Sequence, residues 1–274
     1  RGEPGEFAGP TPDSAFTPFE KSSTLRVVGR APKGVTGTRI RYWADRQIFT
    51  RDASFSLEDL QQRARQTAFL VPGLSITITD ERDPEVPLTT EYRFDGGISE
   101  FAEFLAPDAA VTDTWRLQGT GTFTETVPVL QASGAMVPTE LERTCEVDVA
   151  VRWGTGYETT MRSFVNIIAT PKGGTHQQGF EAGLMKVIRT QVEQNARRLK
   201  VGNDKLDKDD ILAGLTVVLT VRLPEPQFEG QTKEVLGTPA VRQIVSTVVA
   251  RELAARFSSS KRDDKAQTSL LLDK

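Results

Sequence analysis

The stretch LTVVLTVRL at residues 215–223, followed by PEPQFEGQTK at residues 224–233, decides the fold prediction for this chain. Its first nine residues form a nearly continuous apolar run, which is typical of a strand buried on both faces of a sheet. Pro224 and Pro226 end the strand, because proline cannot continue the backbone ladder. The sequence therefore predicts a central strand whose stiffened exit leads into a polar loop.

That loop carries an amide, a hydroxyl and an ammonium group, on Gln231, Thr232 and Lys233. Gly237-Thr238-Pro239 then opens a helix. Loops held between rigid elements often carry function, and a lysine there suits a terminal phosphate as a point charge. An ordinary solvated lysine is the alternative from the residues alone.

The segments before this strand predict a first layered domain that ends at about residue 106. Residues 1–35 are rich in Pro, Gly, Ser and Thr and predict mostly irregular structure. The remaining predicted elements alternate between strand and helix patterns. They are a strand at Thr38–Trp43, a helix opened by the capping pair Ser56 and Asp59 and ended by Pro72-Gly73, a strand at Leu74–Thr79 paired with Thr90–Phe94, and a short helix with Ile98, Phe101, Phe104 and Leu105.

The segments after residue 106 predict a second domain of mixed helices and strands, so the fold class is α+β. Its predicted elements are three β-rich stretches at Thr114–Val129, Glu140–Trp153 and Tyr157–Ile168, a loop at Ala132–Pro138, a long helix with Phe180, Leu184, Val187, Ile188 and Val192 on one stripe, a charged loop at Lys200–Asp210, and a final helix from Val241 to Leu253. From Ser258 the sequence is polar apart from Leu270-Leu271-Leu272, and outside these leucines we expect a frayed tail over residues 259–274.

Composition limits the function classes. The chain has 274 residues, with 38% apolar and 26% charged residues, which is typical of a globular protein. The formal net charge of -3 means that any nucleic-acid contact must come from a local basic patch. There is no apolar run long enough to span a membrane. The single cysteine, Cys145, excludes an intramolecular disulfide, fits a reducing cytoplasm, and is expected to be a buried small hydrophobe.

His176 is the only histidine, so it is the one possible imidazole base. It follows Gly173-Gly174-Thr175 just before the long helix, where a role in bracing the turn is favoured over catalysis. A histidine-based metal cluster is excluded. The chain has neither a Walker-type phosphate loop nor a dinucleotide-binding glycine motif, and Gly34-Val35-Thr36-Gly37-Thr38 is more often a turn than a nucleotide contact.

Several motifs together resemble the B subunits of bacterial type IIA DNA topoisomerases, the family of gyrase and topoisomerase IV. They occur in the family's order over residues 34–257. They are Gly37-Thr38-x-Ile40-Arg41, Ala68-Phe69-Leu70 through Asp80-Glu81-Arg82, Phe94-Asp95-Gly96-Gly97-Ile98, Gly173-Gly174-Thr175-His176 with Gly179-Phe180, Ile211-Leu212-Ala213-Gly214-Leu215, and Pro226-Gln227-Phe228-Glu229-Gly230-Gln231-Thr232-Lys233.

The resemblance implies a fold and a nucleotide site. Residues 1–106 would be the later part of a GHKL-type ATPase domain, and residues 107–258 a transducer domain like domain 2 of ribosomal protein S5. ATP and Mg²⁺ are the implied cofactors, with no Mg²⁺ ligand in this chain. The family's γ-phosphate contacts fall on Gln231 and Lys233, with Lys233 as the catalytic cation. Thr38 matches the threonine beside the adenine pocket, and Arg41 matches the following arginine less closely.

The resemblance also implies partners. The family lines a DNA cavity with basic residues, which suggests Lys186 and Arg189 on the long helix as phosphate contacts. A plain solvated helix face is equally consistent with them. DNA, the topoisomerase A subunit in an A2B2 assembly, and a second copy of the B subunit joined through a region before Arg1 are the implied partners, in the cytoplasm and without a membrane.

The chain departs from the family pattern in three respects, the first being that the family's metal-binding, acidic nuclease-like domain and the DNA-contact regions after it are not recognisable in the sequence. The family's general-base glutamate, magnesium-binding asparagine, adenine-binding aspartate and glycine-rich lid should precede Arg1, so the isolated chain is expected to be inactive. The stretch Leu117–Pro138 is longer than usual and has no assigned role. Another GHKL relative, such as a mismatch-repair protein, and a non-catalytic binding module stay as alternatives. The sequence does not separate gyrase from topoisomerase IV.

Overall fold

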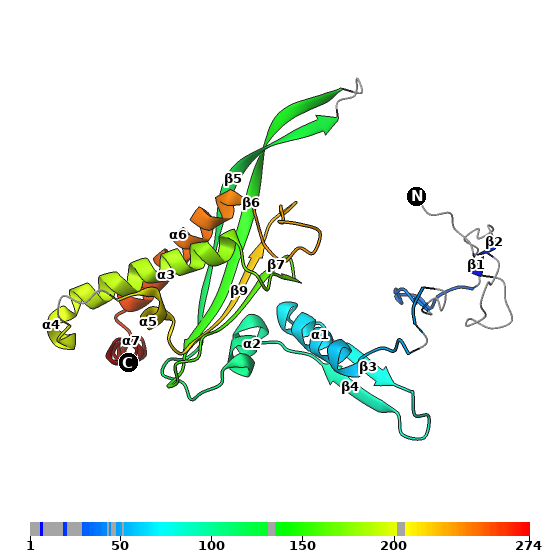
Figure 1. Cartoon of the computed structure of the whole chain (residues 1–274), viewed down its shortest axis with the longest axis horizontal. Helices are drawn as coiled ribbons and strands as arrows, with labels where there is room; N and C mark the ends of the chain where they lie inside the picture. Colours follow the sequence, from blue (N-terminus) through cyan, green and yellow to red (C-terminus); the bar gives the residue numbers. More distant parts are fainter. Residues whose placement is uncertain are drawn as a thin grey trace. The chain divides into compact units, whose positions relative to one another are not determined.

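The computed structural model describes residues 29–42, 44, 48–50, 52–130, 135–201 and 206–274, together with two short strands at 6–7 and 19–20. The chain divides into two compact units, Arg1–Leu60 and Gln61–Lys274. In the first unit, β1 (Glu6–Phe7) and β2 (Phe19–Glu20) pair in antiparallel fashion. In the second unit, two sheets and most of the helices form a mixed α+β fold (Figure 1).

The predicted strand at Thr38–Trp43 is wrong over its described residues. Thr38 to Tyr42 have no regular structure, and Trp43 lies outside the described residues. Ile40 is 84% exposed and Tyr42 is 61% exposed. The alternating pattern supplies strand propensity, but a strand is stabilised by pairing and by a covered face. Among the described residues, none pairs with this segment as a strand.

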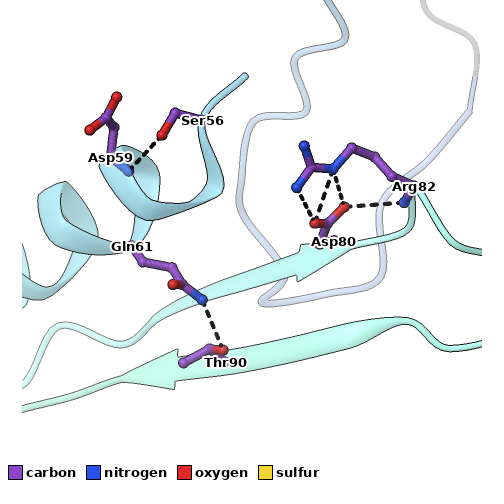
Figure 2. Close-up of polar contacts among 6 residues, drawn as sticks. All are labelled: Ser56, Asp59, Gln61, Asp80, Arg82 and Thr90. Carbon is purple, nitrogen blue, oxygen red and sulfur yellow. Dashed lines mark hydrogen bonds and ion pairs between the residues drawn. The ribbon is translucent and has the colours of Figure 1, made fainter. Parts of the chain in front are cut away.

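Helix α1 (Leu57–Leu70) begins where the capping pattern predicts. Ser56 Oγ accepts a hydrogen bond from the backbone N–H of Asp59 at 3.1 Å, which satisfies one free amide of the first turn (Figure 2). The helix buries one stripe of its surface, made of Ala64, Ala68, Phe69 and Leu70. It ends before the turn at Pro72-Gly73, and Gly73 has a positive φ of 82°.

The predicted hairpin after α1 is confirmed. Strands β3 (Ile76–Asp80) and β4 (Leu88–Tyr92) are antiparallel, with a register from Ile76 opposite Tyr92 to Asp80 opposite Leu88. Gln61 Nε2 donates to Thr90 Oγ1 at 3.4 Å, which connects α1 to the hairpin (Figure 2). At the start of the connecting turn, Arg82 Nε donates to Asp80 Oδ1 at 2.9 Å.

Helix α2 (Gly97–Leu105) joins the hairpin region to the larger sheet. The ring of Phe69 stacks on those of Phe94 and Phe101, with centroids 3.6 and 4.7 Å apart. Phe101 in turn lies 6.1 Å from Phe164. One apolar cluster therefore contains residues from both sides of position 106. The domain boundary at that position stays a prediction.

The larger sheet has the order β5-β6-β9-β7-β8, and only the β7–β9 pairing is parallel. Its strands are β5 (Trp115–Leu130), β6 (Met136–Trp153), β7 (Thr160–Val165), β8 (Ile168–Ala169) and β9 (Leu215–Arg222). The central strand β9 is buried on both faces, as predicted. Val217, Leu219 and Val221 belong to the main core with the long helices, whereas Val218 packs with the α2 cluster.

Helices α3 (Thr175–Gln194) and α6 (Pro239–Phe257) pack on each other beside the sheet (Figure 1). Gly179 and Gly183 permit the close approach, because a Cβ at Gly179 would lie 2.4 Å from Arg242 O. Two short helices, α4 (Ala196–Leu199) and α5 (Lys208–Leu212), follow α3. The predicted charged loop at Lys200–Asp210 therefore contains the start of α5. No helix among the described residues is long and apolar enough to cross a membrane.

The expectation of a frayed C-terminal tail is wrong, because residues Arg262–Asp273 form helix α7. Gln267 Oε1 accepts from Trp115 Nε1 at 2.7 Å, and Arg198 Nη1 lies 2.6 Å from Asp273 Oδ1. The polar composition of this segment agrees with its exposure, because no residue of α7 is fully buried. A few side-chain bonds to the core are enough to dock a polar helix, and composition does not reveal them.

Beyond Gly121 and Cys145, β5 and β6 continue as a two-stranded arm that extends past the rest of the sheet (Figure 1). We define the arm as residues 122–130 and 136–144. It is only two strands wide because β9 pairs with β6 only from Glu146 to Trp153. The predicted loop at Ala132–Pro138 is shorter, since β6 begins at Met136. The predicted loop ended at Pro138, yet Pro138 lies within β6. Proline is tolerated in a strand where its position needs no backbone N–H donor.

Candidate nucleotide-contact loop

Between β9 and α6, residues 224–238 fold back on themselves, and we call them the β9–α6 loop. Glu229 N donates to Val235 O at 2.9 Å, and Gly237 N donates to Gln227 O at 2.8 Å. Phe228 and Leu236 form an isolated antiparallel bridge. The loop is thus a narrow hairpin, and its tip is residues 230–233.

The tip presents Gln231, Thr232 and Lys233 as exposed side chains. Gly230 has φ 83° and Lys233 has φ 57°, so both occupy the left-handed region. A lysine rarely adopts this conformation, which costs on the order of 1 kcal/mol or more unless surrounding contacts impose it. Lys233 Nζ lies 5.9 Å from the centroid of the Phe228 ring, within the range of a cation–π contact.

The base of the loop rests on the turn between β8 and α3. Leu236 N donates to Gly173 O at 3.1 Å, and Thr175 N donates to Leu236 O at 2.9 Å. Gly174 has φ 134°, and a Cβ there would lie only 2.4 Å from Leu236 O. Gly174 is therefore required by the close approach of two backbones, whereas Gly173, with φ 77°, supplies the left-handed turn before it.

His176 is the buried support of that turn. It is fully buried, and its Nε2 lies 3.0 Å from Thr170 Oγ1. Thr170 Oγ1 is 2.8 Å from Ser163 Oγ, which makes a buried chain of polar groups. Burial lowers the pKa of His176 to about 4, so the ring is neutral at pH 7. The predicted bracing role is confirmed.

Charged side chains secure both flanks of the loop. On the exit side, Lys172 Nζ lies 2.8 Å from Glu234 Oε2, and Thr232 Oγ1 donates to the same oxygen at 3.0 Å. The bond from Lys172, and after it the bond from Thr232, lowers the pKa of Glu234. On the entry side, Arg143 Nη2 donates to Glu225 Oε2 at 2.6 Å.

A further bond on the entry side joins the loop to the base of the arm, where Gln227 Nε2 donates to Glu125 Oε1 at 2.8 Å. Sequence reasoning did not find any of these anchors. Lys172 and Glu234 are 62 positions apart, and Gln227 and Glu125 are 102 apart. Contacts at such separations leave no periodic signal in a single sequence.

The structure brings some of the predicted site residues together. Gln231 and Lys233 share the loop tip, and Lys186 and Arg189 share the exposed surface of α3. Arg189 Nε donates to Leu206 O at 3.1 Å, so this side chain has a structural bond. Thr38 is exposed in the irregular part of the first unit, as is Arg41.

Cys145 is not a candidate nucleophile. Its thiol is buried in the main core. Burial raises its pKa to about 12, with a smaller contribution from Glu146, so the reactive thiolate is suppressed at neutral pH. The prediction of a buried structural cysteine is confirmed.

The chemistry of the tip fits an anionic group. Within the described parts of the chain, Lys233 forms no ion pair with a carboxylate, so its positive charge is available at the surface. Gln231 adds an exposed amide donor two positions away. An ammonium and an amide on one exposed tip can bind a phosphoryl oxygen by charge-assisted and neutral hydrogen bonds.

Comparisons with known proteins agree with this architecture. A family model described as DNA gyrase B matches residues 97–272. The B subunit of DNA gyrase from Campylobacter jejuni is 36% identical over 251 residues, which cover 92% of this chain and 29% of that protein. Its counterpart from Staphylococcus aureus strain MRSA252 is 34% identical over 221 residues, which cover 81% of this chain and 31% of that protein. The chain thus spans about a third of the length of these curated relatives.

Solved structures give the same result. The crystal structure of the 43K ATPase domain of Thermus thermophilus gyrase B has a TM-score of 0.64 and 28% identity, covering 90% of this chain and 60% of that one. The topoisomerase IV ATP-binding domain of Francisella tularensis has a TM-score of 0.58 and 23% identity, and the match covers 84% of this chain and 56% of that one. At this identity it supports the fold alone. The fold is therefore that of the ATPase regions of bacterial type II topoisomerases. Within this class, the chain belongs to the DNA gyrase B family.

Proposed function

We propose that this chain is the ATP-sensing and force-transmitting part of a type II DNA topoisomerase, coupling ATP binding and hydrolysis to DNA strand passage. The observation that carries the proposal is the exposed tip with Gln231 and Lys233 on an anchored loop, in a chain of the DNA gyrase B family. Residues up to about 106 act as part of the GHKL-type ATPase domain, and residues 107–258 act as the transducer.

Bound ATP with Mg²⁺ supplies the phosphoryl group whose transfer to water drives the cycle. Lys233 neutralises charge on the terminal phosphate, and Gln231 donates a hydrogen bond to it. Hydrogen bonds to charged groups contribute roughly 1.5–3 kcal/mol each. Thr38 lies beside the adenine pocket. Because Lys233 and Gln231 lose their phosphate contact after hydrolysis, the transducer is released to move as a hinged body.

The transducer acts within a larger assembly. We propose an A2B2 complex with the topoisomerase A subunit in the cytoplasm, with DNA as substrate and two copies of the ATPase subunit. Lys186, which is exposed on α3, contacts DNA phosphates. Arg189 is a weaker candidate, because its guanidinium already bonds Leu206 O. The family match favours this proposal over a mismatch-repair relative.

The experiment is Lys233→Ala in the full-length ATPase subunit, assembled with its partner subunit. We expect DNA-stimulated ATP hydrolysis to fall at least ~100-fold, because comparable cations in phosphoryl transfer contribute ~10³-fold or more. The matched control is Lys208→Ala, which removes an exposed lysine whose ion pair with Glu181 is 2.7 Å long. Near-normal turnover of the Lys233→Ala enzyme would remove the proposed role of the loop tip. The isolated chain is expected to hydrolyse no ATP.

A further inference from the structure

Glu234, the residue after Lys233, joins the β9–α6 loop to the β8–α3 turn. Glu234 Oε2 accepts from Lys172 Nζ at 2.8 Å and from Thr232 Oγ1 at 3.0 Å. Its backbone oxygen accepts from Lys172 N at 3.3 Å. Lys172 thus bonds both the side chain and the main chain of Glu234. Thr232 and Glu234 flank Lys233, so the position of Lys233 is restricted from both sides.

These bonds matter because Lys233 is in a conformation it would not keep alone. Its φ of 57° is left-handed, and a free lysine relaxes to negative φ. The bond from Lys233 N to Gly230 O is long, at 3.4 Å, and does not by itself impose the conformation. The neighbouring bonds at Glu234 are shorter and reach a turn built on buried His176.

We propose that Lys172 and Glu234 are positioning residues, which hold the backbone of Lys233 so that its ammonium and the Gln231 amide are preorganised toward the terminal phosphate of a bound nucleotide. This inference rests on the proposed function. Preorganisation lowers the cost of ordering the loop at the moment of reaction. Lys172 acts through Glu234 and does not itself touch the nucleotide.

The first test needs no catalysis. Trypsin cleaves after lysine. The rate of cleavage between Lys233 and Glu234 depends on how often the loop opens. In the nucleotide-free, full-length protein, Lys172→Met should accelerate cleavage at this bond by roughly 3- to 10-fold, in line with the modest strength of an exposed ion pair. Mass spectrometry of the fragments gives the rate at this bond alone.

The matched control is Lys208→Met, which breaks an ion pair of similar length at the opposite end of β9 from the loop. It should leave cleavage after Lys233 unchanged. Lys172→Met leaves the residues at the cleavage site intact, so the change in rate reports loop opening. Equal cleavage rates in native, Lys172→Met and Lys208→Met proteins would overturn the positioning role.

The second test is kinetic. Lys172→Met and Glu234→Gln should each lower kcat by roughly 3- to 10-fold, with KM for ATP changed by less than about 2-fold, because misplacement weakens a contact needed in the transition state. The double variant should be no worse than either single variant, since both remove the same bond. Exchanging the charges, in Lys172→Glu with Glu234→Lys, should restore most of kcat.

The outcomes separate the two proposals. If Lys233→Ala abolishes turnover while Lys172→Met and Glu234→Gln are normal, the positioning inference fails and the proposed function stands. If Lys233→Ala is nearly normal, the proposed function fails, whatever the trypsin result. Multiplied losses in the double variant would show that Lys172 acts independently of Glu234, which also overturns the pair.

Discussion

The β9–α6 loop and the arm both extend beyond the five-stranded sheet, but they are held in opposite ways. The loop has backbone bonds to the β8–α3 turn and side-chain bonds on both flanks. The arm has the bonds of Glu125 and Arg143 to the loop at its base, but beyond them only the ladder between its own two strands, with side chains that alternate between half-buried and exposed. The fold therefore concentrates its constraints behind a short charged tip, and not along its longest projection.

The same contrast appears in the local chemistry of the two segments. The loop contains a left-handed lysine and rests on Gly174, where an added Cβ would collide with the backbone of Leu236. The arm consists of regular extended backbone that requires no unusual residue. Strain of this kind is retained where surrounding structure imposes it, which is common at functional sites. Substitutions behind the loop should therefore cost far more stability than changes in the arm.

The largest effect is expected from Gly174→Ala. The new Cβ would lie 2.4 Å from Leu236 O and 2.5 Å from Leu236 N, at a φ of 134°. The turn and the loop must separate, so the free energy of unfolding should fall by ~3 kcal/mol or more, as measured by urea denaturation.

Gly230→Ala is the control, because its φ of 83° is also positive but no atom lies within 4 Å of the added Cβ. It should lower the free energy of unfolding by only about 1 kcal/mol, which is the cost of the unfavourable backbone conformation alone. Equal losses in the two variants would mean that the packed backbones contribute nothing beyond strain.

A pH-dependent effect of intermediate size is expected from His176. Its folded pKa is about 4, below the ordinary value of 6.5, because burial disfavours the charged ring. The unfolded chain therefore binds a proton before the folded chain does as pH falls. Stability from the neutral ring is fully present above about pH 6.5 and is lost progressively toward about pH 4.

Between pH 7 and 5 the free energy of unfolding should drop by about 2 kcal/mol from this group. Hydrogen exchange should show faster opening of the Gly173–Thr175 turn at pH 5, with the arm unaffected. His176→Gln removes the titrating ring and should flatten this part of the pH profile. An equally steep profile in that variant would assign the effect to other groups.

Much of the fold around these two projections was predictable from the sequence. The apolar run at residues 215–223, the stripes of α3 and α6, and the alternating hairpin at β3 and β4 each follow from local periodicity, since burial imposes the period. The same reasoning failed where contacts with distant residues determine the secondary structure. Thr38–Tyr42 alternate but lack a strand partner among the described residues, and α7 is polar but docks through Gln267.

The candidate site was predictable in its tip and not in its supports. Gln231 and Lys233 lie near glycine and proline residues, which mark turns in a sequence, and they match a family motif. Lys172, by contrast, is one of many solvated lysines until the fold places it 2.8 Å from Glu234. The residues of a site that touch ligand tend to be grouped in sequence, whereas those that hold them in place come from distant segments.

The smallest effect is expected from shortening the arm. Residues 128–138 can be replaced by Asn-Gly, because Val127 lies opposite Thr139 and a two-residue turn fits that register. Glu125 and Arg143, which bond the β9–α6 loop, are retained. A two-stranded ribbon adds little stability of its own, so the free energy of unfolding should change by less than about 1 kcal/mol, and trypsin cleavage after Lys233 should not change. A larger loss of stability, or faster cleavage, would show that constraint on the loop extends into the arm beyond Val127, and that the two projections are mechanically one structure.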